Sequence, residues 1–283
     1  MCYTMRAIDE IDEFFMRCNM NKNTFTKIGL NKGEVNVYNF GTIKLHAYKT
    51  NDLMSDEVFI VEKNGQSVVI ESPCFFDNEK EFSDYVKDLN VVGVLVSYHA
   101  AGGSFLANVK KYGTKSAKNY AESGGGKALI DNFTKAFGDT FDNKLHKITE
   151  ILNSGEVIIG GIRFVIVPND EAYTIQIPEI NAVYMHMLGH DCHSIVAGKN
   201  HADAIIAELN EYINKDFCFI LTSHYTPEDL KDAQTKITYL QNLKKLASEC
   251  ENANQFKVCV KECYPNYDGE NYLDMTANMF FGS

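Results

Sequence analysis

A short segment near the middle of the chain holds residue types that commonly bind metals or transfer protons. The segment YMHMLGHDCHS, residues 184–194, contains His186, His190, Asp191 and His193. With His201 just beyond it, half of the chain's eight histidines lie between residues 186 and 201. Imidazole and carboxylate groups at close spacing can hold a cation or act as acid and base. The alternative is that they are ordinary structural residues that happen to be neighbours.

Histidines also follow other segments that are expected to be strands. The apolar segment VLVSYH ends at His99, AVYMHM leads to His190, Asp191 and His193, and FCFILTSH ends at His224. Ligands in layered α/β proteins gather at strand ends. Zinc, iron and manganese accept imidazole and carboxylate donors. These five residues are therefore predicted to form one metal site.

Two tyrosines lie beside these histidines. Tyr98 precedes His99, and Tyr225 follows His224. A phenol at such a position can bind a substrate or stabilise a developing oxyanion. The other interpretation is aromatic packing at the rim of the site.

Composition restricts the class of protein. The chain has 283 residues, 45% of them hydrophobic, and a net charge of −11. This acidity disfavours nucleic acid, whose phosphates would be repelled. No apolar run approaches the roughly 20 residues that span a bilayer, and the acidic N-terminal segment does not resemble a secretory signal. The eight cysteines include no CxxC pair. The expectation is a cytoplasmic protein, without nucleic-acid or membrane partners, that binds a small molecule.

The pattern of apolar residues predicts two strand-rich lobes within one domain. Short β-branched runs occupy residues 33–72 and again 156–187, and both sets are followed by helical patterns. Residues 1–32 are expected to carry an N-terminal helix at Ala7–Cys18. The two-lobed body would cover 33–226, and residues 227–283 would form C-terminal helices and an aromatic tail. Further predicted elements are helices at 78–89, after Gly102–Gly103, within 123–137, 201–213, 227–250 and 254–264, and strands at 91–98 and 216–223.

The order of these elements and histidines resembles the metallo-β-lactamase superfamily. The matching features are a β-meander ending in VVIES, a helix, a strand ending in a histidine before Gly-Gly, and a second lobe whose last strand ends in histidine. The resemblance runs from about Gly33 to Pro227. It implies an α/β fold, a four-layer αββα sandwich, with the site at the edge between two sheets. It also implies hydrolysis by water that a divalent metal activates.

The metal-binding motif of that family is largely missing. The signature is His-x-His-x-Asp-His-x-Gly-Gly. Aligned on Gly102–Gly103, this sequence has Leu95, Ser97, His99 and Ala100 at the four ligand positions. His99 therefore stands in the place of the aspartate, and a standard two-zinc site cannot form.

The remaining family positions are filled unevenly. Asp170 or Glu171 stands nearest the next histidine position, and His224 matches the last one. The bridging aspartate could be Asp191 or, with a shorter alignment, His186. Three states stay open: a rebuilt, mononuclear site, a metal-free catalyst, or a fold kept for binding alone.

The leading hypothesis is a hydrolase of a small ester, lactone, thioester or phosphoester. His99, Asp191 and His224, helped by His190 or His193, would hold zinc or, alternatively, iron or manganese. Asp191 would also orient the attacking water.

Tyr225 or Tyr98 would stabilise the oxyanion in this hypothesis. The rival is a non-catalytic binding or sensor protein with the same fold. The aromatic tail from about Tyr264 is expected to be ordered and buried, on the body or in a homodimer, because soluble monomers rarely expose large apolar patches.

Overall fold

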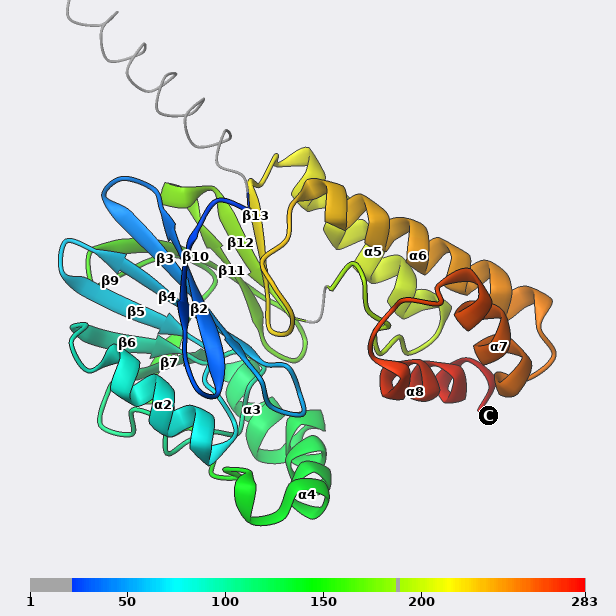
Figure 1. Cartoon of the computed structure of the whole chain (residues 1–283), viewed down its shortest axis with the longest axis horizontal. Coiled ribbons are helices and arrows are strands. Elements are labelled where there is room, and N and C mark those ends of the chain that lie inside the picture. The colour runs from blue at the N-terminus through cyan, green and yellow to red at the C-terminus, as the bar shows by residue number, and fades with distance from the viewer. Residues whose placement is uncertain (1–21, 187–188, 283) are drawn as a thin grey trace, which may run out of the picture.

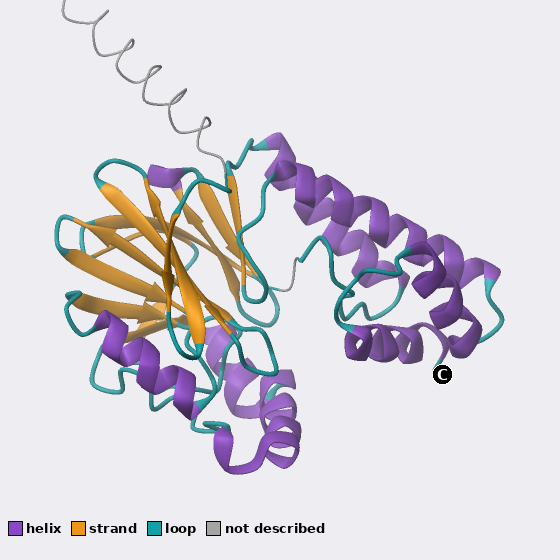
Figure 2. Ribbon diagram, in the orientation of Figure 1, coloured by secondary structure: helices purple, strands orange, loops and turns teal. Residues whose placement is uncertain are grey.

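Two β-sheets face each other, and helices cover their outer sides (Figures 1 and 2). The computed structural model describes residues 22–186 and 189–282. The first sheet has the strand order β1-β2-β3-β4-β5-β6-β7-β8, and the second has the order β13-β12-β11-β10-β9. The strands of the first sheet are β1 (Thr26–Gly29), β2 (Gly33–Asn39), β3 (Ile43–Thr50), β4 (Glu57–Lys63), β5 (Gln66–Ile70), β6 (Val91–Leu95), β7 (Lys111–Thr114) and β8 (Glu150–Leu152). Those of the second are β9 (Gly155–Ile159), β10 (Ile162–Pro168), β11 (Tyr173–Ile177), β12 (Ala182–Met185) and β13 (Phe219–Thr222).

The helices lie on both sides of the paired sheets (Figure 2). They are α2 (Phe76–Val86), α3 (Lys115–Ser123), α4 (Gly125–Phe137), α5 (Lys199–Asn214), α6 (Leu230–Glu249), α7 (Ala253–Cys263) and α8 (Glu270–Phe281). Two short 3-10 helices occupy Gly138–Thr140 and Pro178–Ile180. Among the described residues, no helix is both long and apolar enough to cross a membrane.

The hydrophobic core is divided into layers. Inward-facing residues of both sheets, such as Phe59 and Phe164, form the central cluster. The other face of the first sheet packs against α2 through Phe82. The other face of the second sheet packs against α5 and α6 through Leu209 and Ile237. Successive side chains of a strand point to opposite faces of its sheet. Each strand can therefore pack against the facing sheet on one side and against helices on the other. The predicted αββα sandwich is confirmed.

Two pairs of parallel neighbours bring distant segments to one edge. In the second sheet, β12 and β13 run parallel, with Met185 paired to Thr222. In the first sheet, β5 and β6 run parallel, with Ile70 paired to Leu95. Because parallel neighbours end at the same edge, the residues that follow these four strands are brought together.

Several local predictions were wrong. The helix expected after Gly102–Gly103 is a series of turns that leads to β7. Gly102 has φ +82°, and a Cβ there would meet the carbonyl oxygen of Pro73. The loop therefore passes close to neighbouring backbone, where only glycine fits. The helix expected to begin at Pro227 begins at Leu230, because Asp229 caps it together with Asp232. The helix predicted at Ala7–Cys18 lies outside the described residues.

The C-terminal segment docks on the body. Helices α5 to α8 share a cluster that includes Leu240, Phe256, Leu273 and Ala277. Thr276 donates its hydroxyl to the carbonyl of Ser194, at 2.7 Å. The expectation of a buried tail is confirmed in part: α8 buries Leu273, Thr276 and Ala277 in or beside this cluster, whereas Met275 and Met279 are exposed.

Candidate metal site

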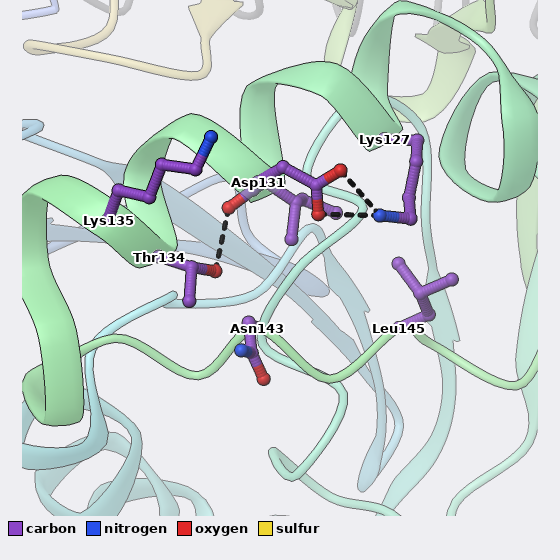
Figure 3. Close-up of a pocket in the computed structure, with 7 residues that line it drawn as sticks. Lys127, Asp131, Thr134, Lys135, Asn143 and Leu145 are labelled. Atoms are coloured by element: carbon purple, nitrogen blue, oxygen red, sulfur yellow. Dashed lines mark hydrogen bonds and ion pairs between the residues drawn. The ribbon is translucent and has the colours of Figure 1, made fainter.

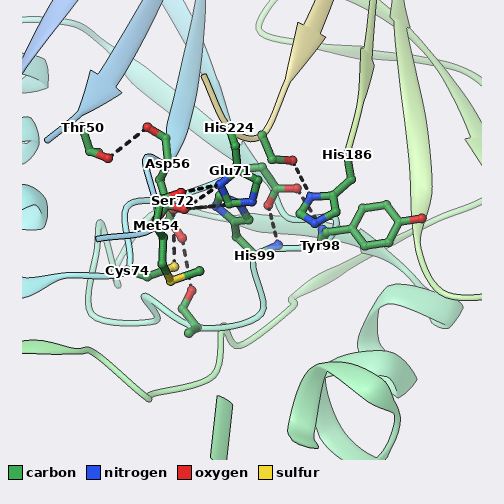
Figure 4. A network of polar contacts seen from close by, with 12 residues as sticks. Thr50, Met54, Asp56, Glu71, Ser72, Cys74, Tyr98, His99, His186 and His224 are labelled. Atoms are coloured by element: carbon green, nitrogen blue, oxygen red, sulfur yellow. Dashed lines mark hydrogen bonds and ion pairs between the residues drawn. The ribbon is translucent and has the colours of Figure 1, made fainter. Parts of the chain in front are cut away.

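Three histidines from three distant segments meet at the edge between the sheets (Figure 4). His99, His186 and His224 each offer a ring nitrogen, and these atoms lie within 4.8 Å of one another. The ring centroids are 5.3 to 6.0 Å apart. Donors at this spacing can bind one cation after small side-chain movements.

The strand topology explains the meeting. His186 follows the last residue of β12, and His224 comes two residues after β13. These strands are parallel neighbours, so both histidines leave at the same edge. His99 follows β6 in the facing sheet. Asp56, just before β4, forms an isolated bridge with His224 and so connects the two sheets.

Backbone carbonyls fix two of the rings. Nδ1 of His99 lies 3.0 Å from the carbonyl oxygen of Ser72, and Nδ1 of His224 lies 3.0 Å from that of Met54. A carbonyl only accepts, so in the neutral rings each Nδ1 carries the proton and each Nε2 has a free lone pair. Metal-binding histidines are commonly oriented in this way.

A chain of hydroxyls fixes the third ring. Nδ1 of His186 lies 2.6 Å from Ser223 Oγ, which lies 2.6 Å from the hydroxyl of Tyr184. Tyr184 in turn donates to Oε1 of Glu71, at 2.6 Å. Because the carboxylate accepts, each hydroxyl must donate toward Glu71, and His186 must donate from Nδ1. The lone pair of His186 is therefore on Nε2, as in the other two rings.

Glu71 also holds the loop that carries His99. Its carboxylate accepts the backbone N–H groups of Ser97, Tyr98 and His99 at 3.2, 2.8 and 3.1 Å. Glu71 is fully buried and has φ +66°, a region that non-glycine residues rarely occupy. With the hydrogen bond from Tyr184, the Glu71 carboxylate accepts four hydrogen bonds, and these stabilise the strained conformation.

A buried carboxylate faces the histidines without a well-formed hydrogen bond of its own. Asp56 is 0% exposed, and among the described residues neither side-chain oxygen has a well-formed hydrogen bond, although the thiol of Cys74 interacts weakly with the carboxyl group. Its Oδ1 lies 3.4 Å from Nδ1 of His224 and 3.9 Å from Nε2 of His99. Nε2 of His99 is also buried without a partner. Buried polar groups are normally satisfied, so these orphaned atoms fit a site for a divalent cation.

The site's electrostatics depend on Asp56. Burial lowers the pKa of His186 well below its ordinary value and that of His224 to about 3, and nearby histidines add to both shifts. Burial acts on His99 in the same direction, but the charges of Asp56 and Glu71 outweigh it and raise its pKa. Burial raises the pKa of Asp56 to about 8. In the absence of a cation, the Asp56–His99 pair therefore keeps a proton near neutral pH.

The other predicted ligands do not join this group. In the described part of the chain, His190 and Asp191 belong to a second group with Glu228. His190 Nδ1 lies 2.8 Å from Oε1 of Glu228, and the Asp191 side chain is 61% exposed. His193 is buried against the hydroxyl of Tyr239, at 2.8 Å. The prediction that Asp191 with His190 or His193 would approach both His99 and His224 was wrong.

The two tyrosines lie in different places. Tyr98 stacks on His186 with ring centroids 4.6 Å apart, so it forms one wall of the site. Its hydroxyl accepts a hydrogen bond from Asn169 at 2.8 Å. The Tyr225 hydroxyl instead interacts with the thiol of Cys192. Tyr225 is therefore not oriented toward the histidines as an oxyanion donor.

Strand parity would have identified His186. Tyr184 points into the central cluster, while Val183 and Met185 point to the other face. His186 is two residues after Tyr184, so it continues on the inner face. Asp191 lies five residues further along, within a loop where this period no longer applies. Asp56 carried no comparable signal, because a single acid before a strand is common.

A surface hollow beside α4 has, among the described residues that line it, no group of histidines or buried acids like that of the candidate metal site. It is lined by Lys127, Asp131, Thr134, Asn143 and Leu145, among others (Figure 3). Lys127 and Asp131 form an exposed ion pair there, at 2.5 Å. None of the clustered histidines lines this hollow.

Similarity to known structures is confined to the fold. No family profile and no curated protein matches the sequence. A metallo-β-lactamase from Erythrobacter litoralis matches with a TM-score of 0.53 and 12% identity, over 77% of this chain and 100% of that one. A metallo-β-lactamase family protein from Thermus thermophilus matches with a TM-score of 0.60 and 11% identity, over 84% and 91%. The chain has the metallo-β-lactamase fold.

A third similar structure is the inverting sec-alkylsulfatase Pisa1 from Pseudomonas sp.. It matches with a TM-score of 0.57 and 13% identity, over 83% of this chain and 48% of that one. The present chain therefore spans about half of the alkylsulfatase.

Proposed function

We propose that this protein is a metal-dependent hydrolase with a mononuclear site formed by His99, His186, His224 and Asp56. The observation that supports it is the convergence of three rings whose Nδ1 atoms are engaged and whose Nε2 atoms remain available. In the family's pattern, His99 stands at the aspartate position of the first motif and His224 at the last histidine position. His186 stands at the bridging-aspartate position under the shorter of the two alignments. The substrate class is a small ester, lactone, thioester or phosphoester.

The chain's own groups define the chemistry. A divalent cation at this site would lower the pKa of a bound water and polarise the substrate's carbonyl or phosphoryl oxygen. Asp56 would offset part of the cation's charge and can accept a proton at Oδ1. Tyr98, stacked on His186, would limit where the substrate can lie. Zinc is the first candidate, because it accepts imidazole and carboxylate ligands and, in catalytic sites, keeps a position open for water.

One observation favours the non-catalytic alternative. His99 is 5% exposed, His224 is 4% exposed and Asp56 is fully buried. His186 is the more accessible of the three rings, so its side is the expected approach for a substrate. A protein that binds a metal for structure or sensing would have the same burial, so hydrolysis must be tested separately from metal binding.

Metal content is the first measurement. Protein purified without chelators or affinity-tag metal should contain about one zinc, iron or manganese ion per chain by elemental analysis. His186→Ala should lose it, and His190→Ala, a matched control in the second group, should keep it. A wild-type protein that cannot be loaded with any of these metals would refute the proposed function.

Hydrolysis is the second measurement. The loaded protein should hydrolyse at least one member of a panel of nitrophenyl esters, lactones, thioesters and phosphoesters. This activity should disappear in His186→Ala. Stoichiometric metal without hydrolysis of any of the four classes would favour the sensor interpretation.

A further inference from the structure

A cysteine faces the buried carboxylate of the candidate metal site. The sulfur of Cys74, an oxygen of Asp56 and a ring nitrogen of His99 lie within 4.8 Å of one another. Cys74 comes two residues after Ser72, whose carbonyl orients the His99 ring. The segment after β5 therefore positions both the ring and the thiol (Figure 4).

The surroundings of Cys74 differ from those of a simple core cysteine. Cys74 is 3% exposed, and the hydrogen bond of its thiol to the carbonyl of Ser72 is long, at 3.8 Å. Among the described residues, both oxygens of Asp56 and Nε2 of His99 are buried without well-formed hydrogen bonds. The thiol of Cys74 interacts weakly with Asp56, but Nε2 of His99 has no hydrogen-bond partner in the part of the chain that the structure describes. A cation between Asp56, His99 and the sulfur would satisfy the polar atoms of all three.

Charge balance points in the same direction. Three neutral imidazoles leave the full charge of a divalent cation uncompensated, and burying such a charge is costly. One carboxylate removes half of it. A thiolate beside Asp56 would make the buried site neutral overall, and no other anionic side chain belongs to the described donor groups that include His99.

We propose that Cys74 is a thiolate ligand of the cation, alongside His99 and Asp56. The inference rests on the proposed function, because His99 belongs both to this group and to the group of three histidines and would hold the same cation. When the sulfur–metal bond forms, the thiol proton is released to water, so no oxidant or reductant is needed. Sulfur ligation would favour zinc, cobalt or iron and disfavour magnesium, calcium and manganese, which prefer oxygen.

Cobalt(II) spectroscopy tests this ligand directly. Metal-free protein is titrated with Co²⁺, bound cobalt is counted by elemental analysis, and the visible and near-ultraviolet spectrum is recorded. The wild type should show an intense sulfur-to-cobalt charge-transfer band together with the weaker bands of the metal itself. Cys74→Ser should bind cobalt without the charge-transfer band. Cys192→Ser, a matched control at a buried thiol outside the donor groups, should keep it.

The outcomes separate the two proposals. Cobalt bound to the wild type without the charge-transfer band would refute the thiolate ligand and leave the histidine site standing. A band that persists in Cys74→Ser would also refute it. Failure of the wild type to bind cobalt would refute both. If Cys74→Ser does not fold, as judged by circular dichroism, Cys74→Ala takes its place with the same expected spectrum.

Discussion

At the scale of single residues, the site depends on groups that do not contact the cation. Ser223 and Tyr184 connect His186 to the Glu71 carboxylate through hydrogen bonds that all donate toward Glu71. This direction decides which ring nitrogen of His186 carries the proton. Without this chain, His186 could adopt the other tautomer and present an N–H to the cation. Residues of this kind are positioning residues, and their loss should weaken metal binding without abolishing the fold.

Replacing Ser223 should test this chain. Ser223→Ala removes the acceptor for Nδ1 of His186, so zinc affinity should fall by roughly 10- to 100-fold. Competition with a chromogenic chelator measures the affinity. Ser194→Ala, at another buried serine, serves as the control and should leave affinity within about twofold. Equal affinities for all three proteins would show that the hydroxyl chain does not position His186.

Glu71 should affect stability more than any surface acid. Glu71→Gln turns an amide N–H toward backbone N–H groups that can only donate, and leaving buried donors unsatisfied costs about 1–3 kcal/mol each. Urea unfolding of the metal-free protein should show a loss of at least about 2 kcal/mol. Glu150→Gln, which breaks an exposed pair with Lys110, should change stability by less than about 1 kcal/mol. Similar losses for the two variants would contradict the role given to Glu71.

At the scale of elements, α8 ties the C-terminal segment to the body through one face. Leu273 is fully buried in the cluster of α5 to α8, whereas Met279 on the same helix is 44% exposed. The helix therefore contributes through packing of that face more than through its intrinsic helix propensity.

A pair of alanine substitutions tests this packing. Leu273→Ala should destabilise the protein by about 2–5 kcal/mol, because it leaves a cavity among residues that cannot collapse fully. Met279→Ala should change the free energy of unfolding by less than about 0.5 kcal/mol. Denaturant unfolding of both variants provides the comparison. A loss below about 1 kcal/mol for Leu273→Ala would mean that α8 is only loosely attached.

At the scale of the whole molecule, buried acids make the stability depend on pH. Glu79 on α2 is 6% exposed, and burial, followed by the nearby Asp142, raises its pKa to about 8 from an ordinary value of 4.5. The folded state therefore holds a proton that the unfolded state has lost. The stabilisation from protonated Glu79 is complete below about pH 4.5 and declines as the pH rises toward about 8.

Comparison with an amide isolates this effect. Glu79→Gln cannot ionise but can still donate to Asp142, so its stability relative to the wild type should rise from pH 5 to pH 7. The rise should be up to about 1.4 kcal/mol per pH unit, the value for one proton. Chemical unfolding of both metal-free proteins at several pH values gives the difference. A difference that is constant with pH would place the pKa of Glu79 near its ordinary value.

The sequence by itself determined most of the strands and helices, whereas the four layers were expected from its resemblance to the metallo-β-lactamase superfamily, and β1, β7, β8, α3 and α8 were not predicted. Alternating apolar residues specified the strands of both lobes, and His99 and His224 were identifiable because each follows an apolar run. These features are local, since side-chain period and turn residues act within a few positions of one another. The same reasoning predicted a helix after Gly102–Gly103, where close contact with neighbouring backbone requires an irregular loop instead.

Only the tertiary structure decided which residues share the site. The parallel pairing of β12 with β13 places His186 beside His224, and the loop beyond carries Asp191 to a different group. Asp56 and Cys74 lie far from these histidines in the sequence, and nothing in their local context distinguishes them. Their association depends on two sheets meeting at one edge, and such long-range contacts are set by packing of the whole core rather than by any local pattern.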